Sequence, residues 1–308
     1  MARIPRIKIE DEDTCYHVGA RVPGPPKWFP FDDPVARHKL EELIRFYTEA
    51  YFLEVASFSL MSNHYHVQVR FEAFRQLSRS ELEERVALLY PSPEKVLVIP
   101  RDWERFNRRL FDLSELMRNI QGEYAKWYNR NYGRRGSLWA ERFNSTVALG
   151  SQAIQETLAH IELNPVRANL VERPEDYRSS SACLRQIGAD DWLMPLSELF
   201  ERPDHMLNYR SRLYYRGFEG GSKEGARISA STLQQEQERG FRGQGVYRKQ
   251  LRYFIDGLVL GSEEKIKEWI ARFQLQGNYS RPRTPIRHLE GLAFTLCAQR
   301  ASRKPISS

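Results

Sequence analysis

Residues 64–71 alternate strictly between polar and apolar side chains, and this pattern predicts both the type and the orientation of one element of the fold. In a β-strand, residues two apart lie on the same face. The four apolar side chains of this stretch therefore share a face that we expect to be buried in a core. The opposite face is polar and carries His64, His66, Gln68 and Arg70.

The two imidazoles on this polar face are difficult to explain by packing, and they indicate a metal site that faces solvent and a substrate. Neutral imidazole binds zinc, iron, copper, nickel or manganese, so two ligands do not identify the ion. A third ligand has to come from elsewhere in the chain. The alternative is a structural pair of histidines without a metal, because this spacing is common on strands.

The composition is that of a globular, basic protein. The 308 residues are 41% hydrophobic, enough for one large domain or two. The formal charge of +7 favours a polyanionic partner, most often nucleic acid. The three cysteines lie far apart, which argues against a disulfide framework. With no signal-like or membrane-spanning apolar run, we expect a soluble, cytoplasmic protein without a membrane partner.

The order of the predicted elements is β-α-β-β-α-β-α, which indicates an α+β fold of the ferredoxin-like plait type, with helices on one face of an antiparallel sheet. The histidine strand would lie in the interior of that sheet. A charged insertion occupies residues 73–108. The elements are strands at 14–22, 53–61, 64–71 and 137–148, and helices at 33–51, 110–131 and 151–163.

Beyond residue 180 the pattern is weaker. Residues 203–253 are basic, with ten Lys or Arg against four acidic residues between positions 210 and 252. This stretch is either a clamp for a hairpin stem or an RNA, or a disordered tail. Ser262 begins an amphipathic helix that ends near residue 273. We therefore divide the chain into residues 1–180 and a basic, mostly helical accessory region at 181–308.

The helix at 151–163 offers candidates for the third ligand. His160 and Asn164 are four residues apart and share a helix face. An amide oxygen beside two imidazoles makes a mixed site that suits Mg²⁺ or Mn²⁺ when a phosphate completes the shell. The alternative for Asn164 is a helix-terminal residue before Pro165.

Three sequence blocks together resemble a known family. They are the His64–His66 element, the block Gly136–Phe143 (GSLWAERF) and the block His160–Ala168 (HIELNPVRA). In this order they are similar to the single-tyrosine HUH transposases of the REP-associated type, relatives of the insertion-sequence 200/605 enzymes. The resemblance covers about residues 10–180.

The resemblance implies an HUH fold that cuts and rejoins single-stranded DNA, often next to hairpins. It implies that His64 and His66 bind a divalent metal, Mg²⁺ or Mn²⁺, and that Asn164 completes the site. The metal would polarise the scissile phosphate. In the family, a tyrosine one turn before the position of Asn164 attacks the phosphorus and forms a 5′-phosphotyrosine.

This chain has His160 at the tyrosine position, so three interpretations are open. His160 could be a further metal ligand or a general base that activates water. Another tyrosine could attack, and Tyr124, Tyr128 and Tyr132 are the candidates. Alternatively, the protein has lost cleavage and has kept DNA binding.

Basic and aromatic side chains alternate between residues 116 and 142, a combination that is typical of single-strand binding because cations contact phosphates and rings stack on bases. The alternative is a solvated helix face with core aromatics. The predicted nucleic-acid contacts are Arg118, Lys126, Arg130, Arg134, Arg135, Trp139, Arg142 and Arg167.

The leading hypothesis is a transposase-like protein, monomer or homodimer, that binds structured single-stranded DNA and cleaves it with a divalent metal if it is active. The first alternative is a catalytically inactive, domesticated DNA-binding regulator. The second is a basic α+β RNA-binding protein with structural histidines. Whether the protein is an enzyme depends on what replaces the tyrosine.

Overall fold

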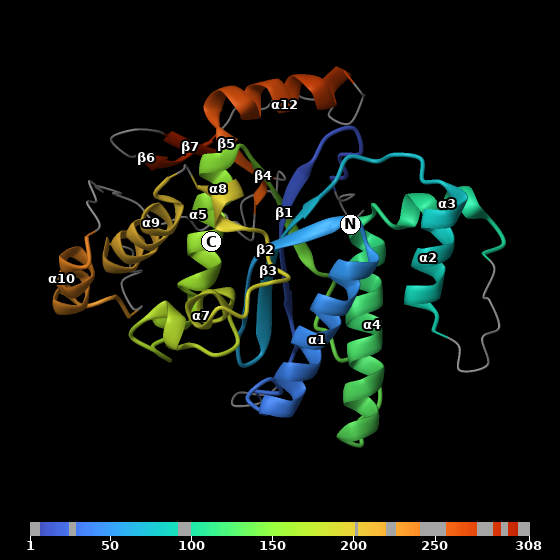
Figure 1. The fold of residues 1–308 in the computed structure, drawn as a ribbon, viewed down its shortest axis with the longest axis horizontal. Helices are drawn as coiled ribbons and strands as arrows, with labels where there is room; N and C mark the ends of the chain where they lie inside the picture. The colour runs from blue at the N-terminus through green and yellow to red at the C-terminus, as the bar shows by residue number, and fades with distance from the viewer. Residues whose placement is uncertain are drawn as a thin grey trace, which may run out of the picture.

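The computed structural model describes residues 7–24, 29–91, 100–200, 203–219, 226–240, 257–275, 286–290 and 295–300. The fold is of the mixed α+β class, as predicted, and helices cover both sides of one open sheet (Figure 1). No helix of the described part is long and apolar enough to cross a membrane.

The sheet has seven strands in the order β2-β3-β1-β4-β5-β7-β6. All neighbouring strands are antiparallel except β4 and β5, which are parallel. The histidine strand β3 lies between β2 and β1, in the interior of the sheet as predicted. The strands are β1 (Thr14–Arg21), β2 (Leu53–Leu60), β3 (His64–Phe71), β4 (Asn144–Leu149), β5 (Gly257–Ser262), β6 (Ile286–Glu290) and β7 (Thr295–Arg300).

One face of the sheet is apolar and is covered by α1 (Pro34–Ala50) and α4 (Leu113–Asn131). The Asp33 side chain accepts a hydrogen bond from the Val35 amide and caps α1, and Pro34 occupies the first turn. Tyr65 of β3 points into this core, where its hydroxyl accepts a hydrogen bond from Gln121 of α4 (3.2 Å). The alternation in β3 therefore predicted its buried face correctly.

The other face is polar and buried, and it is covered by α5 (Ser151–Glu162). The Gln68 amide donates to the Ile154 carbonyl of α5 at 3.1 Å and ties the helix to β3. The outer side of α5 packs against α8 (Leu196–Leu199) and α9 (His205–Glu219) in a second apolar core. The helix α6 (Asn164–Arg167) follows α5 directly.

The predicted strand at 137–148 begins later than expected, at Asn144. Residues 137–143 are irregular instead, with a bend at 139–142. The Ser137 hydroxyl donates to the Trp139 carbonyl (3.0 Å), and Gly136 has a φ of 89°, a backbone conformation that favours glycine. The Ser137 hydrogen bond and the positive φ of Gly136 therefore prevent the strand that the alternation of this segment predicts.

The predicted insertion forms two helices, α2 (Arg79–Leu89) and α3 (Trp103–Arg109), with an apolar cluster of their own. The described part of the C-terminal region contains several helices, and it also contributes β5, β6 and β7, which we had not predicted. Ser262 caps α12 as expected. The remaining helices are η1 (Pro174–Asp176), α7 (Ser181–Ile187), α10 (Ala230–Glu238) and α12 (Glu263–Leu275).

A buried ion pair joins the two parts of the chain on either side of residue 180. Glu162, at the end of α5, is fully buried, and its carboxylate accepts a hydrogen bond from Arg185 of α7 at 2.6 Å. Ser181 and Tyr209 donate to the same carboxylate, each at 2.6 Å.

We expect Glu162→Gln to lower the free energy of unfolding by about 3–5 kcal/mol, because it leaves the Arg185 guanidinium buried without a counter-charge. Urea denaturation measures this change. Glu83→Gln is the matched control, because it breaks the exposed pair with Arg79 and should cost less than about 1 kcal/mol. Equal effects of the two substitutions would contradict the prediction.

Candidate functional site

The two histidines of β3 lie on the polar face of the sheet, as predicted, with ring centroids 5.2 Å apart. His66 is buried, at 4% exposed, and His64 is half-buried. The expectation that this face is open to solvent is therefore wrong for His66, because α5 covers the face. The His64 ring contacts the Asn63 amide oxygen through Nδ1 at 2.9 Å. Since this oxygen only accepts, Nδ1 of His64 carries the proton and Nε2 is the nitrogen with the lone pair.

A third histidine, His17 of β1, contacts the pair and was missed by the sequence analysis. Its Nε2 lies 3.0 Å from Nδ1 of His66, and both rings are buried. The contact is possible because Gly19 stands opposite His66 across the two strands, where an added Cβ would lie only 3.2 Å from His66 Nδ1. The alternation of Cys15, His17, Gly19 and Arg21 along β1 is the signal that could have revealed this face.

Helix α5 brings His160 to the same place. Its ring centroid lies 5.8 Å from that of His17 and 6.1 Å from that of His66. Arg167 of α6 folds back over this histidine, with Nη1 at 3.1 Å from Nδ1 and 3.2 Å from the carbonyl oxygen. The residue at the tyrosine position of the resemblance is therefore next to the histidine strand.

The surroundings keep these imidazoles neutral. Burial, and then the nearby Arg21, lowers the pKa of His64 to about 4. Burial lowers the pKa of His66 well below its usual value, and His17 and His64 add to the effect. Burial and Arg167 do the same to the pKa of His160. Neutral imidazole is the form that binds metals, so the electrostatics fit ligation.

Asn164, the predicted third ligand, begins α6, and its side-chain nitrogen donates to the Ile161 carbonyl at 3.3 Å. This contact leaves the amide oxygen as the atom that could ligate a metal. In the described part of the chain, Asn164 makes no hydrogen bond to His64 or His66, and no three His, Cys, Asp or Glu side chains form a metal-binding group. The ligand set therefore stays a prediction.

The three alternative tyrosines lie on the wrong side of the sheet. Tyr124 and Tyr128 belong to α4, which covers the apolar face, and Tyr132 follows the end of that helix. The Tyr124 hydroxyl is buried and donates to the Ala36 carbonyl at 3.1 Å, and burial strongly raises its pKa. We conclude that none of the three is placed to act beside the histidines.

The second sequence block, Gly136–Phe143, lies at the His64 end of the sheet. The Ala140 amide donates to the Arg21 carbonyl at 3.0 Å, and Arg21 pairs with His64 across the two strands. Within this block, Trp139 donates to the Gln121 carbonyl and packs against Tyr65 and Tyr124. The Trp139 ring therefore packs mainly in the core on the apolar face of the sheet.

Ion pairs separate the predicted phosphate contacts into two groups. Arg118 pairs with Glu115, and Lys126 pairs with Glu123 at 2.7 Å. By contrast, Arg130, Arg135 and Arg142 are exposed and have no ion pair to any residue that the structure describes. Arg134 is half-buried, and Arg167 contacts His160. The cations near the Gly136–Phe143 block are thus the ones available to a polyanion.

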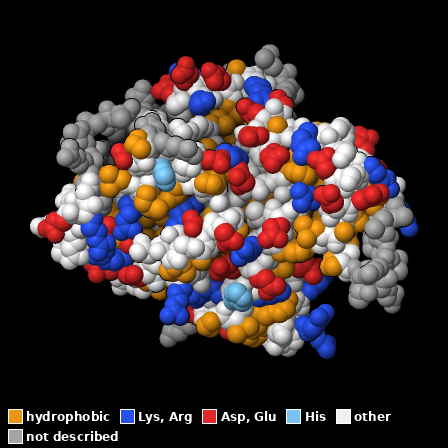
Figure 2. All heavy atoms as spheres, viewed as in Figure 1, with side chains coloured by type: hydrophobic (Ala, Val, Ile, Leu, Met, Phe, Trp, Pro, Cys, Tyr) orange, Lys and Arg blue, Asp and Glu red, His pale blue; other side chains and the backbone are white. Residues whose placement is uncertain are grey.

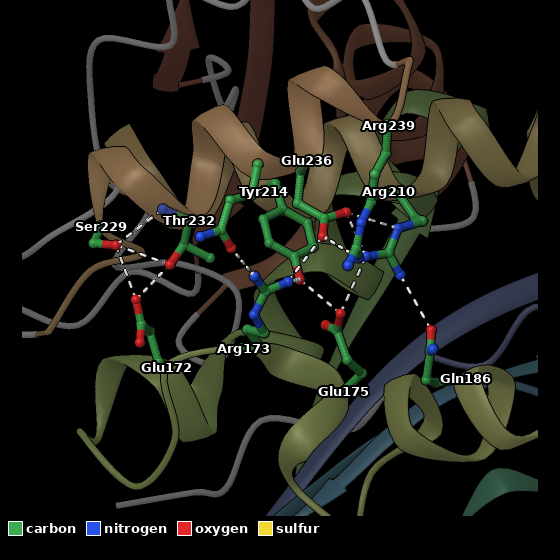
Figure 3. Close-up of polar contacts among 11 residues, drawn as sticks. Glu172, Arg173, Glu175, Gln186, Arg210, Tyr214, Ser229, Thr232, Glu236 and Arg239 are labelled. Carbon is green, nitrogen blue, oxygen red and sulfur yellow. Dashed lines mark hydrogen bonds and ion pairs between the residues drawn. The ribbon is translucent and has the colours of Figure 1, made fainter.

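The basic stretch at 203–253 is largely neutralised where the structure describes it. Figure 3 shows Arg173, Arg210 and Arg239 converging on Glu236 of α10, a fully buried residue. Arg212 and Arg216 pair with Glu156 of α5 in the same way. These cations hold helices together, and residues 241–253 lie outside the described part.

Comparisons with known proteins add little to this description of the site. No protein-family model and no curated protein matches the chain. A solved structure described as a REP-associated tyrosine transposase bound to a REP hairpin is similar, with a TM-score of 0.42 and 13% identity over 75% of this chain and 100% of that one. At this TM-score we base no argument on the similarity.

The depressed histidine pKa values make the stability of the metal-free protein depend on pH. Below about pH 6.5 the unfolded chain binds protons at these histidines and the folded chain does not, so stability should fall from pH 7 toward pH 5. Each histidine should lower the free energy of unfolding by up to about 1.4 kcal/mol for every pH unit of this fall. Urea unfolding in EDTA measures the slope, and His66→Gln should make it shallower. An unchanged slope would contradict the assignment.

Proposed function

We propose that the protein is transposase-like and binds structured single-stranded DNA, with hairpins as its targets. The observation that carries the proposal is the convergence of the three sequence blocks. His64 and His66 lie on β3, the Gly136–Phe143 block contacts the end of β1 beside His64, and His160 of the third block faces His66. Blocks that are far apart in the chain thus form one site.

The topology supports the same proposal. The first four strands have the order β2-β3-β1-β4, all antiparallel, and α1 and α4 lie together on one face. This order supports our proposal of a ferredoxin-like plait built from two β-α-β units. The polar histidine face is then the one opposite the two helices, which leaves α5 to supply the remaining site residues.

Mg²⁺ or Mn²⁺ is the cofactor that we propose, held by His64 and His66 with the Asn164 oxygen. The fit rests on two neutral imidazoles whose Nδ1 atoms are both engaged by protein, His64 by Asn63 and His66 by His17. Such contacts orient the rings and leave Nε2 for an ion. When bound, the metal would supply electrophilic activation of a phosphate.

Water rather than a tyrosine is the nucleophile we propose if the protein cleaves DNA. Tyr124, Tyr128 and Tyr132 lie with the helix layer of the opposite face, and His160 holds the position beside the histidines. Because Arg167 donates to Nδ1 of His160, Nε2 of this neutral ring carries the proton, so His160 would donate a hydrogen bond to the water or the phosphate rather than act as a general base. The second candidate function, a DNA-binding regulator without cleavage, is favoured by the same replacement of tyrosine.

One set of reactions tests the proposal. A hairpin-bearing single-stranded oligonucleotide should bind with an affinity that falls steeply with salt, because phosphate contacts release counterions. With Mn²⁺ added, denaturing gels should show nicked DNA and no SDS-stable protein adduct. His64→Ala should abolish nicking and leave hairpin binding largely unchanged.

His38→Ala is the matched control, because His38 is exposed on α1, and it should change neither readout. Absence of hairpin binding would refute the proposal, and a covalent adduct would refute water as the nucleophile. Binding without nicking would select the regulator.

His17 provides a test of the metal assignment that does not depend on activity. We expect His17→Ala to weaken Mn²⁺ binding by about 10–100-fold, because the His66 ring loses the contact that orients it. Titration followed by electron paramagnetic resonance measures the affinity, and His17→Gln should restore part of it by offering a replacement hydrogen bond. Equal affinities of wild type and His17→Ala would contradict this role.

A further inference from the structure

A group of arginines lies where α5 meets α9 and α6. Arg212 and Arg216 of α9 pair with the two carboxylate oxygens of Glu156, at 2.5 Å and 2.8 Å, and both Arg216 and Glu156 are buried. Arg167 of α6 belongs to the same group, because Arg216 and Glu156 both act on its pKa. Among these four side chains, three guanidinium groups face one carboxylate, which is an excess of two positive charges.

Arg167 is the cation of this group that has no carboxylate partner in the described part of the chain. Its Nη1 contacts only uncharged acceptors, Nδ1 and the carbonyl oxygen of His160. Its Nε is buried and makes no hydrogen bond to any residue that the structure describes. Burial, and then Arg216, lowers the pKa of Arg167 to about 10, so the side chain is still charged at neutral pH. A buried charge without a counter-charge is costly.

Other charged groups of the molecule are balanced. Figure 2 shows acidic and basic side chains intermixed over the face that it draws. In the cluster of Figure 3, each arginine is matched by a glutamate: Arg173, Arg210 and Arg239 lie among Glu172, Glu175 and Glu236. By contrast, Arg167 has no acid to balance it in the described part, and an anionic ligand would supply the missing charge.

The arginine group borders the histidine face of the sheet. His160 and Arg167 are both half-buried, so part of each side chain reaches the surface. Burial lowers the pKa of His160, and Arg167 and Arg216 add to this effect, so both cations lie near its ring. The centroid of that ring lies 6.1 Å from the centroid of the His66 ring. An anion held by these arginines would therefore lie next to the proposed metal site.

We propose that Arg167 and Arg216 form a site for a dianionic phosphate, and that the terminal phosphate of a cut DNA strand is its source. The inference rests on the proposed function and deepens it. Hydrolysis joins a water oxygen to phosphorus and breaks one ester bond, so one new DNA end carries a phosphate monoester and the other a hydroxyl group.

The charge of the ligand distinguishes such an end from an uncut strand. A phosphate monoester carries about −1.5 to −2 charges at pH 7, whereas an internal phosphodiester carries one negative charge. The monoester matches the excess of two positive charges in the arginine group. Guanidinium groups also suit this ligand, because two of their N–H groups can donate to one phosphate. Free inorganic phosphate has the same chemistry, and the experiment separates the two sources.

Three versions of one hairpin-bearing oligonucleotide test the inference: one with a 5′-phosphate, one with a 3′-phosphate, and one with hydroxyl groups at both ends. In EDTA, which prevents metal-dependent cleavage, wild type should bind one phosphorylated version about 10–100-fold more tightly than the hydroxyl version, as expected for a hydrogen bond to a charged group. Fluorescence anisotropy of internally labelled DNA measures the affinities. At constant ionic strength, inorganic phosphate should compete with the preferred version and not with the hydroxyl version.

Substitutions of one residue locate the site. Arg167→Gln should remove the difference between the phosphorylated and hydroxyl versions. Arg167→Lys keeps the charge and loses the planar fork, so it should retain part of the difference even if Arg167→Gln does not fold. Arg105→Gln is the matched control, because Arg105 is exposed without an ion pair to any described residue, on α3, which lies away from α5 (Figure 1). It should keep the full difference.

The outcomes separate this inference from the proposed function. If wild type binds all three versions equally, the phosphate site is refuted and the proposed function stands. If calorimetry shows that inorganic phosphate binds and no oligonucleotide does, the proposed function is wrong and the site takes free phosphate. If neither binds, both are wrong. If Arg167→Gln and Arg167→Lys both keep the full preference for a phosphorylated end, Arg167 does not hold the phosphate, and the inference is again refuted.

Discussion

One face of the central sheet is both polar and buried. The rest of the structure depends on giving the polar groups of this face hydrogen-bond partners. A buried polar group without a partner costs several kcal/mol, so the side chains of this face must bond to each other or to the helix that covers them. Gln68 bonds to the backbone of α5, and His66 bonds to His17. The Gln68 contact ties α5 to β3 and so helps to position His160, whereas the His66–His17 contact joins two strands.

Much of this arrangement could be predicted, because it is encoded by local patterns. The alternation at 64–71 predicted the strand and its two faces, the order of the elements predicted its interior position, and Asp33-Pro34 predicted the start of α1. The sequence did not reveal the contacts between segments that are far apart in the chain. His17 meets His66 only because Gly19 leaves room between them, and no local rule indicates that two strands far apart in the chain will pair in that register.

The strands β5, β6 and β7 and the burial of Glu162 were also missed. From the sequence alone, Glu162 resembles a surface residue of a helix. In the structure its carboxylate is buried by hydrogen bonds from Arg185, Ser181 and Tyr209, which belong to later elements. In the same way, counting basic residues overestimated the charge available to a partner. Arg210 pairs with Glu236 inside the basic stretch and with Glu175 outside it, and Arg216 pairs with Glu156 of α5.

The parallel pairing of β5 with β4 has a consequence for how the chain can be divided. The pairing covers the backbone edge of β4, next to the strand that carries His17. A fragment that ended near residue 180 would leave this edge open, with amide and carbonyl groups ready to add a strand from another molecule. The half of the chain that carries the histidines would then be prone to self-association, so its solubility depends on a strand that arrives more than a hundred residues later.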